Sequence, residues 1–198
     1  FTQYSSKDGI AGDIITDITE DKDANIWFTS TWGGVTKFDG RKFTIYNKYE
    51  NNTEINGQES IYTDSKGTIY ITNDKNLYYY SNGIFKKIST NISNNIKAPI
   101  SQIVEDSKGN LWISTIEGLL YLNGTDTLLI TEKDGLPSNF ITYVHEDIDG
   151  NYIIGTHRSG VVKLLRGSID NKRQFVFNPI NINPNIVVTS IKTDRDKN

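Results

Sequence analysis

The sequence predicts an all-β protein made of about four repeated units, each with four antiparallel strands. Three observations predict this class: a segment that recurs at nearly constant spacing, a strand-rich composition and the lack of helical periodicity. Of 198 residues, 11 are Tyr, 8 Phe, 3 Trp, 16 Gly and 4 Pro, which is typical of sheets and turns. No stretch longer than about ten residues has apolar side chains at helical spacing, so helix content should be near zero.

A twelve-residue segment recurs four times without a gap, at residues 18–29, 61–72, 103–114 and 144–155. Each copy holds a marker aspartate, and Asp21, Asp64, Asp106 and Asp147 stand 43, 42 and 41 residues apart. A period of about 40–50 residues is that of one four-stranded propeller blade. We therefore expect a β-propeller-type array of about four blades, either part of a larger propeller or a small atypical one.

Turn residues divide each repeat into four strands. The first strand ends near the marker aspartate, and a tight turn to the second strand follows. Gly67, Gly109 and Gly150 stand where this turn needs positive φ, whereas Ala24 in the first copy should strain or reshape it. Third strands are predicted at residues 34–38, 77–80, 118–122 and 160–164, and fourth strands at residues 43–46, 84–88, 127–130 and 175–177.

Two repeated features have structural interpretations. One position of the second strand is held by Trp27, Tyr70, Trp112 and Ile153, and we expect these side chains to be wedged between adjacent blades. Glu-Asp pairs occur at residues 20–21, 105–106 and 146–147. Because they recur at one place in separate blades, we expect them to cap turns rather than to act as paired catalytic carboxylates.

Composition argues against several classes of function. With 21 basic and 24 acidic side chains, the net charge of −3 gives no reason to expect a nucleic-acid partner. The chain has no Cys and 2 His, so neither a thiolate metal site nor an imidazole-rich one is expected. No apolar run exceeds four residues, far short of a membrane-spanning helix.

We expect no catalytic residues and no cofactor. Neither His145 nor His157 lies near a Gly-x-Ser-x-Gly motif, and no Walker-type phosphate loop occurs. A glycosidase with two carboxylates stays open, because their separation in space is not visible in a sequence. The chain starts without Met or a signal sequence, and we expect it to be part of a longer protein.

Residues 133–164 resemble the two-component regulator propeller repeat. They hold an Asp-Gly-Leu-Pro opening at residues 134–137, a Glu-Asp-x-x-Gly-Asn turn at residues 146–151 and a third strand starting at Gly160. The opening recurs at residues 7–13, and residues 105–122 match the turn and the strands. The copy at residues 61–80 is degenerate, with Tyr70 in place of Trp and Asn76 in place of Gly.

The resemblance implies a sensor. Proteins with this repeat are typically extracytoplasmic regions of bacterial membrane-bound signalling proteins, often hybrid histidine kinases, and many respond to oligosaccharides. It implies that residues 1–177 form the blades and that residues 178–198 are a linker and the start of an Ig-like domain. The chain would lie on the periplasmic or extracellular face of the membrane, and any kinase activity would lie outside it.

A ligand is expected at one end of the blades, where the loop into each first strand and the loop between the second and third strands emerge together. These loops are residues 7–13, 49–60, 91–99 and 133–139, and residues 30–33, 73–76, 116–117 and 157–159. Trp32 could stack on a sugar face or simply pack within its loop. The side chains that could bind hydroxyl groups, or simply be solvated, are Asp13, Glu117, Asn139, His157 and Arg158.

Two functions therefore compete. The first is a domain that binds a small polar ligand, such as an oligosaccharide, and relays a signal to the rest of a membrane-anchored protein. The second is a propeller for protein–protein interaction or self-association without a small ligand. An open array would expose blade edges and apolar surface, which favours a homodimer. A pocket lined by Trp would favour the first, and an apolar self-complementary face the second.

Overall fold

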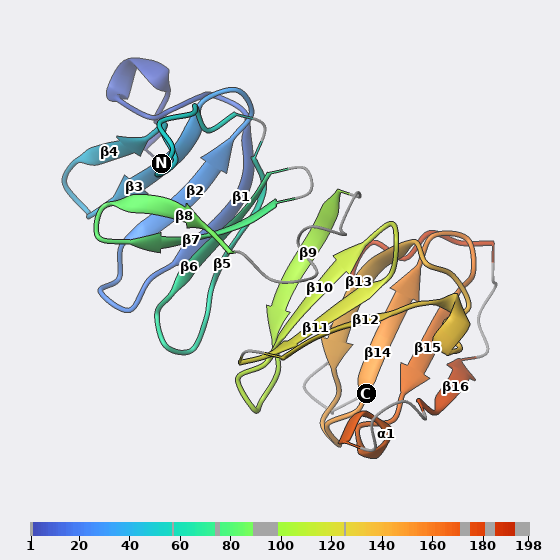
Figure 1. The fold of residues 1–198 in the computed structure, drawn as a ribbon. Coiled ribbons are helices and arrows are strands. Elements are labelled where there is room, and N and C mark those ends of the chain that lie inside the picture. The colour runs from blue at the N-terminus through green and yellow to red at the C-terminus, as the bar shows by residue number, and fades with distance from the viewer. Residues whose placement is uncertain are drawn as a thin grey trace. The chain divides into compact units, whose positions relative to one another are not determined.

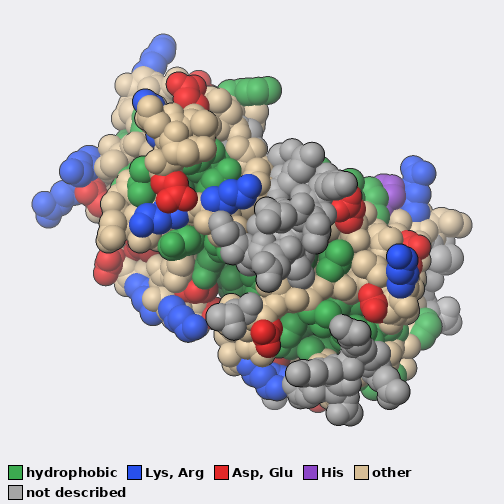
Figure 2. Space-filling view, in the orientation of Figure 1, with side chains coloured by type: hydrophobic (Ala, Val, Ile, Leu, Met, Phe, Trp, Pro, Cys, Tyr) green, Lys and Arg blue, Asp and Glu red, His purple; other side chains and the backbone are tan. Residues whose placement is uncertain are grey.

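The computed structural model describes residues 2–56, 58–73, 76–88, 99–124, 126–170, 175–180 and 185–192. The chain divides into two compact units, Phe1–Ile100 (unit 1) and Ser101–Asn198 (unit 2), each with two sheets (Figure 1). Basic and acidic side chains are interspersed on the face drawn in Figure 2. This mixture agrees with the small net charge of −3.

Unit 1 contains two four-stranded antiparallel sheets, blade 1 and blade 2, whose strands pair in chain order. Blade 1 consists of β1 (Ile15–Glu20), β2 (Ile26–Ser30), β3 (Gly34–Phe38) and β4 (Phe43–Tyr46). Blade 2 consists of β5 (Gln58–Thr63), β6 (Ile69–Asn73), β7 (Asn76–Ser81) and β8 (Ile84–Lys87). The predicted meander is confirmed in this unit.

Unit 2 repeats the arrangement in blade 3 and blade 4. Blade 3 consists of β9 (Ile100–Glu105), whose first residue ends unit 1, β10 (Leu111–Thr115), β11 (Leu119–Asn123) and β12 (Asp126–Ile130). Blade 4 consists of β13 (Ile141–Glu146), β14 (Tyr152–Thr156), β15 (Val161–Leu164) and β16 (Phe177–Ile180). The predicted all-β class with four four-stranded antiparallel blades is therefore confirmed.

Helices in the described residues are single turns. They are the 3-10 helices η1 (Ser6–Asp8) and η2 (Glu132–Asp134) and the short helix α1 (Gly167–Asp170). The low helix content agrees with the prediction.

The last outer strand lies later in the chain than predicted. We expected it at residues 175–177, but β16 is Phe177–Ile180, with Leu164 opposite Phe177. Between β15 and β16 lies α1, where the Ser168 hydroxyl donates to the Leu165 carbonyl. Residues 178–180 are thus part of blade 4, beyond the boundary predicted at residue 177. An Ig-like domain after the propeller stays a prediction.

The core lies between neighbouring blades, as predicted for the repeated aromatic position. In unit 1, Trp27 is buried with Phe85 and Ile71 of blade 2. In unit 2, Trp112 is fully buried with Tyr152 and Val144 of blade 4. Tyr70 and Ile153 hold the same position but are only half-buried. Burial of the aromatic side chains joins the blades in pairs.

The turn after each first strand has one shape in all four copies. The marker aspartate's carbonyl accepts from the backbone N–H three residues later. Gly67, Gly109 and Gly150 have φ of 86°, 82° and 77°, and Ala24 has φ of 60°. The first turn therefore keeps its shape with a non-glycine residue in the left-handed region, which confirms the expected strain.

Ala24→Gly is expected to stabilise unit 1 by about 0.5–1 kcal/mol, because relief of left-handed strain exceeds the added entropy of the unfolded glycine. The matched opposite change is Gly109→Ala, since an added Cβ there meets only the Glu105 Oε1 atom, at 3.5 Å. That variant should lose about 1 kcal/mol. Chemical denaturation measures both, and a destabilised Ala24→Gly protein would contradict the account of the turn.

Candidate functional site: the loop end of the blades

The loops expected to bind a ligand gather at the start of each first strand, opposite the aspartate turns. The register shows this, because Ile15 at the start of β1 lies opposite Ser30 at the end of β2. Ile141 lies opposite Thr156 in the same way in blade 4. Of the predicted loops, residues 57, 74–75 and 91–98 lie outside the described residues.

The loop that opens blade 1 is built around η1. The Ser5 backbone N–H and hydroxyl both donate to Asp8 Oδ2, and Gly9 ends the turn with φ of 98°. A positive φ at this place suits glycine. The chain then buries Ile10. The Asp-Gly-Ile sequence thus encodes a capped turn followed by an apolar anchor.

The loop that opens blade 4 has the same construction. The Thr131 N–H and hydroxyl donate to Asp134 Oδ2, and Gly135 has φ of 107°. Leu136 is buried where Ile10 is buried in blade 1. The repeated opening motif is therefore a structural device that fixes the loop end of each of these blades.

Two of the predicted ligand-binding residues hold these loops closed. Asp13 accepts hydrogen bonds from the Ser6 N–H, at 2.6 Å, and the Ser6 hydroxyl, at 3.1 Å. Asn139 Oδ1 accepts from the Glu132 N–H at 2.7 Å, and the Asn139 N–H donates back to Glu132 Oε1 at 2.8 Å. All four side chains are exposed or half-buried, so binding to a ligand stays a prediction for Asp13 and Asn139.

Trp32 projects into solvent from a strained backbone. It lies in the β2–β3 loop with φ of 65°, and 81% of its surface is exposed. The Trp32 side chain therefore does not pack within its loop, which was the alternative to ligand binding. A positive φ is uncommon for a bulky residue and needs support from its surroundings.

The support for Trp32 comes from the glycine that follows it. A Cβ on Gly33 would lie 2.1 Å from the Ala11 carbonyl oxygen, so only glycine fits against the opening loop there. The Ala11 N–H in turn donates to the Thr36 hydroxyl. The Thr31 N–H donates to the Ile14 carbonyl at 3.0 Å. These contacts fix the two loops side by side and hold the indole outward.

In unit 2, His157 and Arg158 occupy the equivalent loop of blade 4. Arg158 has φ of 62° and an exposed side chain, as Trp32 does in blade 1. The His157 ring stacks on Phe140 with centroids 4.6 Å apart. Glu117, in the β10–β11 loop of blade 3, is exposed, and its N–H donates to the Thr115 hydroxyl. Blades 1 and 4 thus use one strained loop position to present a side chain.

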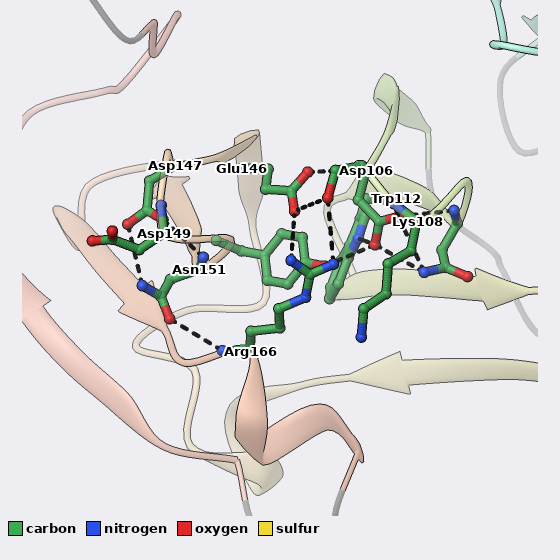
Figure 3. A network of polar contacts seen from close by, with 11 residues as sticks. Asp106, Lys108, Trp112, Glu146, Asp147, Asp149, Asn151 and Arg166 are labelled. Atoms are coloured by element: carbon green, nitrogen blue, oxygen red, sulfur yellow. Dashed lines mark hydrogen bonds and ion pairs between the residues drawn. The ribbon is translucent and has the colours of Figure 1, made fainter. Parts of the chain in front are cut away.

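At the other end of unit 2, a polar network joins blades 3 and 4 (Figure 3). Asp106 Oδ1 accepts from the N–H groups of Lys108 and Asn110, and Oδ2 accepts from Trp112 Nε1 and the Tyr152 hydroxyl. Beside it, Glu146 accepts from the N–H and hydroxyl of Ser107 and pairs with Arg166 at 3.4 Å. Asp106 therefore caps its own turn, as predicted for the Glu-Asp pairs, whereas Glu146 binds the turn of the neighbouring blade, a contact that was not predicted.

Ionisation follows from these contacts. Burial by itself would raise the pKa of Asp106, but hydrogen bonds from Asn110, Tyr152 and Trp112 outweigh it and lower the pKa below its usual 3.8. Burial and the bond to Asp106 both raise the pKa of Tyr152. Asp106 is thus a structural anion that stays ionised at neutral pH. Sequence patterns missed Tyr152, because its partner is 46 residues away.

The described residues contain no group of three or more His, Cys, Asp or Glu side chains placed to hold a metal ion. Nor does the part of the chain that the structure describes contain a helix long and apolar enough to cross a membrane.

Of two sequence comparisons, one matches a short part of the chain. The model of one family, described as two component regulator propeller, matches residues 96–117. None of the curated proteins matches the chain.

Solved structures share the fold over most of the chain. The extracellular domain of the hybrid two component system BT3049 from B. thetaiotaomicron is 23% identical, with a TM-score of 0.79 over 99% of this chain and 28% of its own. The extracellular domain of the one component system BT4673 from the same organism is 19% identical, with a TM-score of 0.65 over 89% of this chain and 26% of its own.

An enzyme also shares the fold. Virginiamycin B lyase from Staphylococcus aureus is 11% identical, with a TM-score of 0.64 over 86% of this chain and 57% of its own. At these identities the likenesses show a propeller fold. The chain spans 28% and 26% of the two extracellular domains.

Proposed function

We propose that the chain, part of which matches the two-component regulator propeller family over residues 96–117, is the ligand-sensing part of a bacterial membrane-bound signalling protein. The sensor lies outside the cytoplasm, and the output module lies elsewhere in the full protein. Support for this location comes from BT3049 and BT4673, whose matching parts are extracellular domains.

The proposed ligand is an oligosaccharide or another small polar molecule. The observation that carries this proposal is Trp32, a large aromatic side chain that is 81% exposed and held outward by a strained backbone. An indole face offers an apolar surface for the C–H groups of a sugar ring, and neighbouring polar groups can bind its hydroxyls. Strain that surrounding contacts maintain is a feature of binding sites.

We propose binding without catalysis. Both histidines are accounted for by other features: His157 stacks on Phe140, and His145 lies on β13 away from the loop end. The lyase with the same fold is a reminder that function is set by the site and not by the fold.

Trp32→Ala is expected to abolish the stabilisation that a cognate saccharide gives. A thermal-shift screen with mono- and oligosaccharides should find a ligand that raises the Tm, since a ligand at about 100 Kd stabilises the native state by about 2.7 kcal/mol. Ile45→Ala is the matched control, because Ile45 is 44% exposed on the outer strand β4. A shift that persists in Trp32→Ala would contradict the proposed site.

The alternative, a propeller for protein interaction or self-association, is favoured by one observation. Ile14, directly before the first strand of blade 1, and Ile18, within that strand, are 66% and 62% exposed. Exposed apolar surface of this kind marks interfaces. Light scattering on the same samples separates the two functions: a stable dimer that no saccharide stabilises would favour the alternative.

A further inference from the structure

The C-terminal segment of residues 185–192 packs back onto blade 4. Val187 forms a bridge with His157, and the Arg158 N–H donates to the Ile186 carbonyl at 3.2 Å. Val188 is 9% exposed, whereas its neighbour Val187 is 45% exposed. The segment therefore places one apolar side chain inward and fastens its backbone to the strained loop.

The inward side chain fills a hollow made by a glycine. A Cβ on Gly155 would lie 2.6 Å from Val188 Cγ1 and 3.4 Å from Ile191 Cδ1. The same position of the repeat is held by Thr29, Thr72 and Ser114, all fully buried. Gly155 is the copy without a side chain at this position, which leaves room for Val188, and its φ lies outside the left-handed region.

The hollow lies on one face of blade 4. In blades 1 and 3, the corresponding face packs against the next blade. There, Val35 and Leu119, at the start of the third strand, are fully buried. The equivalent residue in blade 4, Val161, is only half-buried, and Ile180 opposite it is 36% exposed. In the described residues, Val188 and Ile191 cover this face around Gly155.

At two positions, blade 4 also lacks the polar side chains that form hydrogen bonds with the next blade in blade 1 or blade 3. Asp17 Oδ2 in blade 1 accepts from the Ile61 N–H of blade 2, and Gln102 Oε1 in blade 3 accepts from the Val144 N–H of blade 4. The same position in blade 4 is Tyr143, which has no carboxylate or amide oxygen. The Ser107 N–H and hydroxyl bind Glu146 of the next blade, and Ile148 stands at that position in blade 4.

We propose that residues 185–192, docked on blade 4, couple the loop of residues 157–159 to the rest of the signalling protein. Docking is a property of this chain alone, whereas its use in signalling rests on the proposed function. A ligand that moves Arg158 would then pull directly on the segment through the backbone bond to Ile186.

Amide hydrogen exchange on the 198-residue chain, without ligand, tests the docking. Val188→Asp places a charge in the hollow and should speed exchange of the Arg158 amide by about tenfold or more. Val187→Asp is the matched control, because that side chain already faces solvent, and should change the rate by less than about twofold. The Gly109 amide, bonded to the Asp106 carbonyl of blade 3, reports whether unit 2 stays folded.

A second variant guards against a general effect of the buried charge. Gly155→Ala fills the hollow while Val188 stays apolar, and it should also speed Arg158 exchange and leave Gly109 unchanged. An Arg158 rate that is the same in Val188→Asp and Gly155→Ala as in the wild type would overturn the docking, as would equal effects of the Val187 and Val188 variants. Because no saccharide is added, this outcome is independent of whether Trp32 binds one.

Discussion

Trp112→Ala is expected to lower the free energy of unfolding of unit 2 by about 3–5 kcal/mol, because it removes a large buried side chain and leaves a cavity. Trp112 is fully buried, and its ring lies 4.6 Å from that of Tyr121 and 4.2 Å from that of Tyr152. Its indole Nε1 also donates to Asp106 at 3.1 Å. The change therefore removes both the packing between blades 3 and 4 and one buried hydrogen bond.

Chemical denaturation followed by circular dichroism measures this loss. Ile153→Ala is the matched control, since Ile153 holds the same repeat position but is half-buried, and it should cost about 1–2 kcal/mol. Trp112→Phe separates ring packing from the Nε1 hydrogen bond. Equal losses for the alanine variants at positions 112 and 153 would show that the tryptophan does not hold the blades together.

Asp106→Asn is expected to cost about 2–4 kcal/mol at neutral pH, because buried donors lose their acceptor. Asp106 is 5% exposed and accepts from two backbone N–H groups, Trp112 and Tyr152. An asparagine keeps one oxygen and sets an N–H₂ group against the donors of Trp112 and Tyr152. Asp147→Asn is the comparison: Asp147 makes the same turn contacts and an ion pair with Lys163 at 2.8 Å.

The pH dependence of stability tests the same carboxylate. The folded pKa of Asp106 is lowered below its usual 3.8, so the unfolded chain takes up the proton first as pH falls. The stability that the ionised group provides is therefore complete above pH 3.8 and is lost as the pH drops through the folded pKa. The gap in unfolding free energy between wild type and Asp106→Asn should narrow below that pH. A gap that stays constant down to the acid transition would contradict this ionisation.

The fold was predictable because the same turn residues recur in each repeat. The marker aspartates and turn glycines located the strands, and the third and fourth strands of blade 1 match the predicted residues 34–38 and 43–46. The prediction failed for β16, where helix α1 occupies the turn. A short helical turn stabilised by one Ser168 hydroxyl bond leaves no periodic signal.

The candidate site was only partly predictable. Loop position pointed to Trp32 and Arg158, but their positive φ depends on packing such as that of Gly33 against Ala11, which lies in another loop. The internal pairing of Asp13 with Ser6 was also invisible, since polar loop residues look alike whether they face a ligand or their own backbone. The Gly155 hollow was missed because a single glycine within a strand gives no sign of what fills the space beside it.

The most direct test of the central claim, that Trp32 forms the ligand surface, is a fluorescence titration with the saccharide found by thermal shift. Trp27 and Trp112 are buried and Trp32 is 81% exposed, so the solvent-exposed part of the emission reports on Trp32. Binding should shift that emission to shorter wavelength in the wild type, and Trp32→Ala should show neither the shift nor binding. A saccharide that binds with no change in this emission, or that binds Trp32→Ala with unchanged affinity, would contradict the account.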